Sequence, residues 1–200
     1  MTLPKVGNIA IGLTIISVGV SALIRLNSIN GFIDILRILV CICNLMMGVL
    51  LIFRKEAEFE MPPFSKPYWL GMVVCNIIVF KYTNDLPVIS FPSLLLVIGA
   101  SWTILSLCTL GKQFALFPTN PKIVTKGAYK LVRHPIYLGE SVMLIACFLS
   151  NVSWLSSIVL IIFIVFLYLR INLEEQVMAK RNEYYDYQKK VKWKLLPYVW

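Results

Sequence analysis

The sequence contains little charge for its length. Of its 200 residues, 14% are Asp, Glu, Lys or Arg, whereas 58% are apolar and the mean hydropathy is +0.78. Water-soluble domains carry charge on about a quarter of their residues and apolar side chains on about half. This composition excludes an ordinary soluble domain, a disordered chain and a collagen-like chain. It predicts an integral membrane protein.

The chain also has little of what metal and disulfide sites need. It contains one histidine, and its cysteines lie inside apolar runs without a CxxC pair: Cys41, Cys43, Cys75, Cys108 and Cys147. We expect no metal site and interpret the cysteines as packing residues. The glycine fingerprint of dinucleotide-binding folds, the phosphate loop, HExxH and GxSxG are also absent from the sequence, which excludes the soluble enzyme classes that depend on them.

Apolar segments predict the membrane-spanning helices at residues 6–24, 29–53, 67–80, 88–110, 136–149 and 154–169. The last two are short and separated by the polar turn 150–153, which predicts a helical hairpin. If the chain crosses six times from a cytosolic start, 16 of its 19 Lys and Arg residues face the cytosol, as the positive-inside rule requires. The net charge of +9 then indicates contact with membrane lipids, and we expect no nucleic-acid partner.

The predicted fold is therefore an all-α integral membrane protein. We expect five to six transmembrane helices, a C-terminal helical hairpin, a cytosolic helical tail, and both termini in the cytosol. The chain divides into the N-terminal transmembrane helices (1–110) and a C-terminal part (111–200) with a polar loop, the hairpin and the charged tail. The second part holds 12 of the 19 basic residues, so we expect the chemistry there.

The start of the hairpin carries the first candidate site residues. Pro135 suits the first position of a helix, where no N–H is needed. The helix start beside Arg133 and His134 would favour a carboxylate or phosphate. Gly139 would let a ligand or a neighbouring helix approach closely. Taken singly, these are also ordinary helix-end and packing residues, but Glu140 is an acid inside an apolar segment, which marks a candidate site.

The second group of candidates lies where the hairpin ends. Arg170 is followed by the adjacent acids Glu174 and Glu175. Neighbouring residues on a helix point about 100° apart, so we expect at most one of the two acids to face a pocket. Beyond them, residues 176–190 predict a weakly amphipathic helix, and the aromatic residues 193–200 are expected to dock on the protein or lie in the membrane interface.

Taken in order, these motifs resemble the isoprenylcysteine carboxyl methyltransferase family and the related phospholipid methyltransferases. The resemblance covers residues 111–200 and rests on the runs GKQF, VTKGAY and VRHPIYLG, the Glu174–Glu175 pair, and Glu183, Tyr184, Tyr187, Val191 and Leu196–Pro197. The sequence departs from the family pattern at two places. Residues 180–182 stand where the family usually has a Phe-Gly pair, and residues 192–194 stand where it usually has Pro and Arg. These departures leave open how the tail closes the pocket.

The resemblance implies an S-adenosylmethionine-dependent membrane methyltransferase with a cytosol-facing pocket. It implies a lipid-bearing acceptor, a carboxylate such as that of prenylated cysteine being the best-known one. The implied cofactor-binding residues are Gly127, Tyr129, Arg133, His134, Tyr137, Leu138, Gly139, Glu140, Glu174 and Glu175. Arg170, Glu174 and Glu175 are the catalytic candidates, with Arg170 expected to pair with an acceptor carboxylate.

Two other function classes stay open. A sterol-reductase-like, NADPH-dependent membrane enzyme shares the RHPxY motif, and a non-enzymatic membrane protein could use the charged tail to bind anionic lipid. The sequence leaves the acceptor, the membrane of residence and the oligomeric state open. The enzymatic classes share one geometric expectation: the start of the hairpin and the acidic stretch after it must meet.

Overall fold

The computed structural model describes residues 5–24, 31–53, 90–114 and 123–200. Within them the chain forms only helices, in the order α1 (Lys5–Ile24), α2 (Phe32–Ile52), α4 (Phe91–Leu110), η2 (Gly111–Gln113), η3 (Gly127–Lys130), α5 (Pro135–Ser150), α6 (Trp154–Met178) and α7 (Asn182–Lys190). The all-α prediction is confirmed. The predicted segment 67–80 lies outside the described residues.

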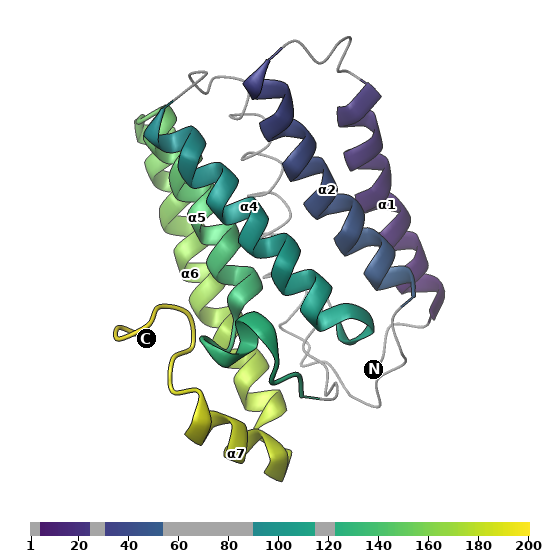
Figure 1. Cartoon of the computed structure of the whole chain (residues 1–200), viewed down its shortest axis with the longest axis vertical. Coiled ribbons are helices and arrows are strands. Elements are labelled where there is room, and N and C mark those ends of the chain that lie inside the picture. The colour runs from purple at the N-terminus through teal and green to yellow at the C-terminus, as the bar shows by residue number, and fades with distance from the viewer. Residues whose placement is uncertain (1–4, 25–30, 54–89, 115–122) are drawn as a thin grey trace.

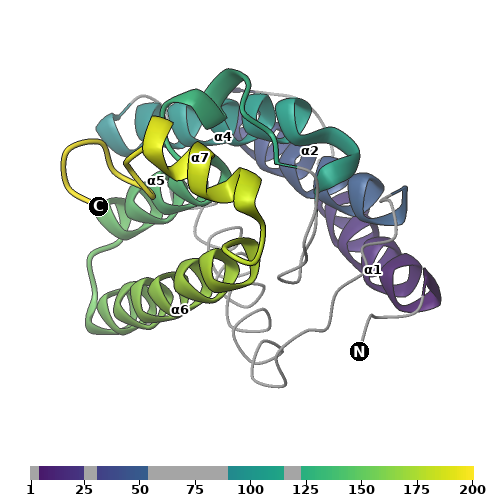
Figure 2. The same cartoon turned by 90° about the horizontal axis from the view of Figure 1, so that it is seen from below.

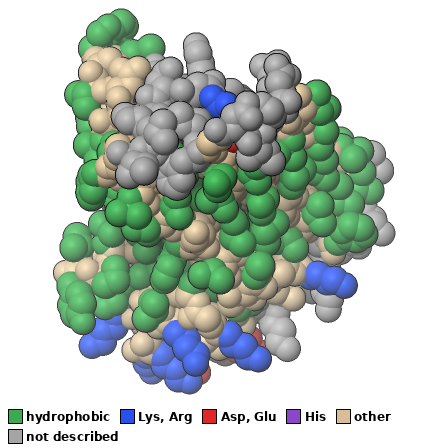
Figure 3. All heavy atoms as spheres, turned by 45° about the horizontal axis from the view of Figure 1, so that its top comes forward, with side chains coloured by type: hydrophobic (Ala, Val, Ile, Leu, Met, Phe, Trp, Pro, Cys, Tyr) green, Lys and Arg blue, Asp and Glu red, His purple; other side chains and the backbone are tan. Residues whose placement is uncertain are grey.

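The helices α2, α4 and α6 are long and apolar enough to cross a membrane, while the apolar stretches of α1 and α5 within the described residues are shorter. Figure 1 shows all five lying along one direction, with η3 and α7 at the end of the bundle where α5 begins and α6 ends. Lys and Arg side chains gather at one end of the face in Figure 3, beyond a largely apolar surface. This arrangement is that of an integral membrane protein.

Glycines set the closest helix contacts. Gly12 of α1 faces Gly48 of α2, and a Cβ at Gly12 would lie 2.8 Å from the Gly48 carbonyl oxygen. Gly139 of α5 faces Gly99 of α4, where a Cβ would lie 2.7 Å from the Gly99 carbonyl oxygen and closer still to Thr103. Small residues let helix backbones approach in this way. The two contacts fix α1 against α2 and α4 against α5.

The main apolar core joins α2, α4, α5 and α6. Its fully buried members include Leu36, Leu96, Ala100 and Ile171, and Leu195 reaches it from beyond α7. The hairpin turns at residues 151–153, where the Ser153 side chain accepts a hydrogen bond from the Ser156 N–H and so caps α6. Figure 2, seen from the end, shows α7 and the segment after it folded back over the ends of α5 and α6.

Two boundaries differ from the sequence-based expectation. The apolar pattern predicts that the sixth segment ends at Leu169, but α6 continues to Met178. No glycine or proline interrupts residues 170–178, and Arg170 pairs with Glu174 one turn later at 2.8 Å, a spacing that supports a helix. The two acids therefore lie on α6, and the amphipathic tail helix begins at Asn182 instead of Gln176.

We predict that Gly139→Ala destabilises the fold by about 1–3 kcal/mol, the usual cost of overpacking, because the atoms that the new Cβ meets belong to the α4 backbone or to buried Thr103. Thermal unfolding in detergent measures the change. Gly31→Ala is the matched control, since Gly31 has extended backbone and its Cβ would meet open space. Equal melting temperatures for the two variants would contradict the packing role of Gly139.

Candidate active site

The segment before α5 begins with a turn at Gly127 that is held against α4. Gly127 adopts a φ of +54° and lies against Thr109 of α4, a backbone conformation that suits glycine. The η3 turn follows, Val132 is fully buried, and Pro135 takes the first position of α5. The predicted helix start is confirmed. No side chain caps this helix start.

The C-terminal segment pairs with the residues that precede α5. The Arg133 N–H donates to the Trp193 carbonyl and the His134 N–H donates to the Lys194 carbonyl, both at 2.9 Å. The carbonyls of the tail therefore bind the two N–H groups that directly precede the start of α5. The aromatic terminus is docked at its base.

Arg133 is the centre of the cluster. Its Nε and Nη2 donate to the two oxygens of Glu175 at 2.7 and 3.2 Å, and its Nη1 donates to the carbonyls of Val191 and Lys192 at 2.8 and 2.9 Å. The side chain is 8% exposed. These bonds use four of the five guanidinium N–H groups. Arg133 thus neutralises the charge of Glu175 and binds carbonyls of the tail. Its part in holding a ligand carboxylate stays a prediction.

His134 contacts both acids. Its Nε2 lies 3.2 Å from Glu175 Oε1 and its Nδ1 lies 3.6 Å from Glu174 Oε2. Both acids therefore reach the cluster, while the expectation that at most one of them faces a pocket stays a prediction. The two side chains diverge along α6, but the opposite edges of one buried imidazole reach both of them.

A second buried set lies beside it. The Tyr137 hydroxyl donates to Glu174 Oε1 at 2.6 Å and accepts from Arg170 Nε at 2.8 Å. Arg170 Nη2 lies 2.8 Å from the same Glu174 oxygen, and the arginine is 3% exposed. The rings of His134 and Tyr137 are stacked with their centroids 5.8 Å apart. Glu174 and Tyr137 therefore bind Arg170 within the protein, and its pairing with an acceptor carboxylate stays a prediction.

Glu140 differs from the other acids of the cluster. It lies one and a half turns into α5, is 7% exposed, and its Oε2 has no hydrogen-bond partner among the described residues. A buried carboxylate oxygen without a donor is costly. It is therefore the group in the cluster best placed to accept a donor from a ligand.

The sequence-based reasoning missed residues that complete the cluster. Lys194 Nζ donates to Asn172 Oδ1 at 2.8 Å and lies 3.7 Å from Glu175 Oε2. The Tyr187 hydroxyl of α7 donates to the Tyr129 carbonyl at 2.7 Å. Lys194 and Asn172 look like ordinary charged-tail residues in the sequence, whereas Tyr187 belongs to the residues that carry the family resemblance and to the amphipathic pattern of 176–190.

The tyrosines below the cluster are neutral packing residues. Tyr129, Tyr184 and Tyr187 are 8% exposed or less. Burial raises the pKa of each phenol well above its usual range, because an apolar environment disfavours the charged form. These side chains hold the η3 turn against α7.

Four predicted cofactor-binding residues lie outside this cluster, and one of them is Tyr129 of the η3 turn. Gly139 packs against α4, Leu138 packs on the main core, and Gly127 forms the turn against Thr109. The residues that the structure does bring together are Arg133, His134, Tyr137, Glu140, Arg170, Glu174 and Glu175.

Fold and site together define a helical membrane protein with a buried ionic cluster where a proline-started helix meets the end of the next one. Residues 88–184 match the family model described as phospholipid methyltransferase. Over that region the chain is similar to this methyltransferase family. A search of curated proteins gave no match. The matched region adds α4 to the part that carries the sequence resemblance and ends within α7, before the docked tail.

We predict that Arg133→Ala destabilises the protein by about 3–5 kcal/mol, because it leaves Glu175 buried without its main partner. The measurement is unfolding in detergent. Arg181→Ala is the control, since its contact with Glu183 is 3.9 Å long and the Glu183 side chain is 74% exposed. Such surface pairs contribute less than about 1 kcal/mol.

A double-mutant cycle separates pairing from packing. Replacing both Arg133 and Glu175 with methionine removes both buried charges, so this double variant should be more stable than either single methionine variant. Additive losses would show that the two side chains do not depend on each other.

Proposed function

We propose that this chain is an S-adenosylmethionine-dependent methyltransferase acting on a lipid-bearing acceptor. The observation that carries the proposal is the unpartnered carboxylate oxygen of Glu140 within the buried cluster of α5 and α6. The match to the methyltransferase family over residues 88–184 supports it. The proposed localisation is a multi-pass membrane protein, with both termini and the site on the cytosolic side, since basic side chains gather at the site end.

The polar and aromatic groups of the cluster suit S-adenosylmethionine. Glu140 Oε2 would accept a hydrogen bond from a ribose hydroxyl or an ammonium group. The uncapped start of α5 would favour a carboxylate. The stacked rings of His134 and Tyr137 offer aromatic faces, which attract a cation.

S-adenosylmethionine supplies, when bound, a sulfonium-linked methyl group, and transfer to a carboxylate forms a carbon–oxygen bond while the carbon–sulfur bond breaks. The residues of this chain need not remove a proton from such an acceptor. Their role is to orient the cofactor and the acceptor and to exclude water from them. Arg170 serves this end by fixing Tyr137 and Glu174, its partners at 2.8 and 2.9 Å.

The acceptor that we propose is a carboxylate on a prenylated cysteine. A phospholipid amine is the other acceptor chemistry, because the matching family model is described by phospholipids. Transfer to an ammonium would require loss of a proton, and Glu140 is the buried carboxylate with a free oxygen among the described residues that could take it.

We predict that the detergent-solubilised protein is stabilised by S-adenosylmethionine and by S-adenosylhomocysteine and not by NADPH. At a hundredfold excess over Kd, binding to the folded state stabilises by about 2.7 kcal/mol. A thermal-shift series with the three compounds measures it. Stabilisation by NADPH alone would favour the reductase class, and no shift with any compound would favour a non-enzymatic membrane protein.

We predict that Glu140→Gln weakens binding of S-adenosylmethionine about 10- to 100-fold, because a hydrogen bond to a charged group contributes about 1.5–3 kcal/mol. The melting temperature without ligand should not fall, since the substitution removes a buried charge. Cys147→Ala on the same helix is the control and should leave affinity and activity unchanged, because Cys147 packs in the main core. Equal affinity for Glu140→Gln and the wild type would remove Glu140 from the site.

We predict that isotope-labelled S-adenosylmethionine transfers its methyl group to a farnesyl-cysteine derivative and not to phosphatidylethanolamine. Mass spectrometry of the products from each acceptor in detergent measures this. Methylation of the phospholipid alone would replace the proposed acceptor while keeping the cofactor.

A further inference from the structure

The last residues of the chain form a closed loop with a buried base and an exposed tip. The Leu195 N–H donates to the Trp200 carbonyl at 2.9 Å, and the Val199 N–H donates to the Leu196 carbonyl at 3.2 Å. At the base Leu195 is 7% exposed and belongs to the main core. At the tip Tyr198 is 87% exposed and Val199 is 75% exposed. The loop therefore exposes two large side chains at its tip.

The depth of this loop is fixed by its contacts with α6. The Trp200 ring stacks on Tyr168 at 5.4 Å, and Lys194 Nζ, which bonds Asn172, lies 5.0 Å from the centre of the Trp200 ring. The apolar run of α6 ends at Leu169, and Arg170 and Asn172 follow. The base of the loop thus lies at the level where α6 changes from apolar to polar, which is where a spanning helix leaves the hydrocarbon.

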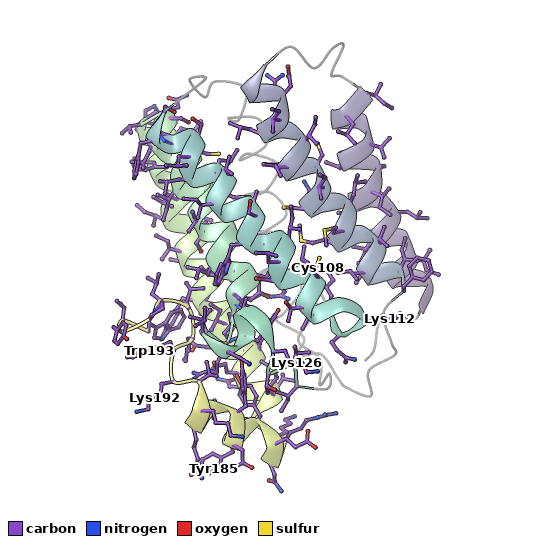
Figure 4. The ribbon with its side chains drawn as sticks, in the orientation of Figure 1. Cys108, Lys112, Lys126, Tyr185, Lys192 and Trp193 are labelled. Carbon is purple, nitrogen blue, oxygen red and sulfur yellow. The ribbon has the colours of Figure 1, made fainter. Side chains whose placement is uncertain are left out.

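The position of the loop in the molecule agrees with this depth. The loop extends sideways from α5 and α6 (Figure 1), and Trp193 lies on it, while Lys192 lies closer to α7 and Tyr185 lies on α7, at the far end of the molecule (Figure 4). At the same level of α6, Tyr168 and Val165 are half exposed. The tip therefore continues the surface that faces lipid.

The composition of the loop fits the membrane interface. Tyr198 lies 5.3 Å from the Trp193 ring, and Lys192 beside it is exposed. Tyr and Trp concentrate at the level of the lipid headgroups, and lysine extends its charge from there toward water. Tyr198 also has a φ of +65°, a conformation that is uncommon for a bulky residue. A polar residue would suit a water-exposed turn better.

We propose that residues 196–199 insert into the interface of the bilayer that the helices cross, with Tyr198 and Val199 among the lipid chains and Lys192 at the headgroups. The loop then anchors the segment whose carbonyls bind Arg133 and His134. This inference rests on the membrane-spanning fold and stands or falls independently of the methyltransferase proposal.

The test places a nitroxide at the tip. Val199→Cys and, as the matched exposed position, Tyr185→Cys are made in a chain with Cys108→Ala, spin-labelled, and reconstituted in vesicles of phosphatidylcholine and phosphatidylglycerol. The chain without an added cysteine gives the background. At position 199 we expect more frequent collisions with oxygen, which concentrates in lipid, than with a water-soluble nickel complex. At position 185 we expect the reverse.

Two results would overturn the proposal. Preference for the nickel complex at both positions would place the tip in water. Low accessibility to both reagents at position 199 would show that protein covers the tip, as in contact with a second copy. Retained helix content and a monodisperse profile in detergent show that each labelled variant is folded.

Discussion

The structure depends on how one buried guanidinium is compensated. Arg133 cannot lose its charge, so its burial requires partners, and these come from distant parts of the chain. Glu175 lies 42 residues away, and the carbonyls of Val191 and Lys192 lie 58 and 59 residues away. The start of α5, the end of α6 and the C-terminal segment are therefore bound to a single side chain. Loss of any one of them would leave a charge or a carbonyl without its partner.

The same network changes the charge that a ligand would meet. In the sequence, Arg133, His134 and Arg170 suggest a cationic site. In the structure, Glu175 compensates Arg133 and Glu174 compensates Arg170, so the paired charges cancel. What stays unpaired among the described side chains of the cluster is the carboxylate oxygen of Glu140. The site is thus better suited to a ligand that brings a donor or a positive charge than the sequence indicated.

Local sequence patterns predicted the features that depend on neighbouring residues, namely the helices and the start of α5. The apolar runs predicted five helices that the structure describes, and Pro135 marked the start of α5. The extension of α6 and the engagement of both Glu174 and Glu175 were not predictable in the same way, because they depend on how far an imidazole on another helix reaches. The role of Lys194 was also hidden, since its partners Asn172 and Glu175 are 22 and 19 residues away in sequence and no periodicity connects them.

The docked tail shows why its unusual sequence does not prevent closure. The residues at 192–194 differ from those usual in the family that the chain resembles, which left the closure of the site open. However, the contacts with Arg133 and His134 use the carbonyls of residues 191–194, and every residue type supplies a carbonyl. The side chains of this segment can therefore make other contacts on its opposite face. There Trp193 packs near Tyr198, while Lys194 reaches Asn172 and Glu175. The backbone contacts therefore hold the tail against the ionic cluster of this chain although residues 192–194 differ from the family pattern.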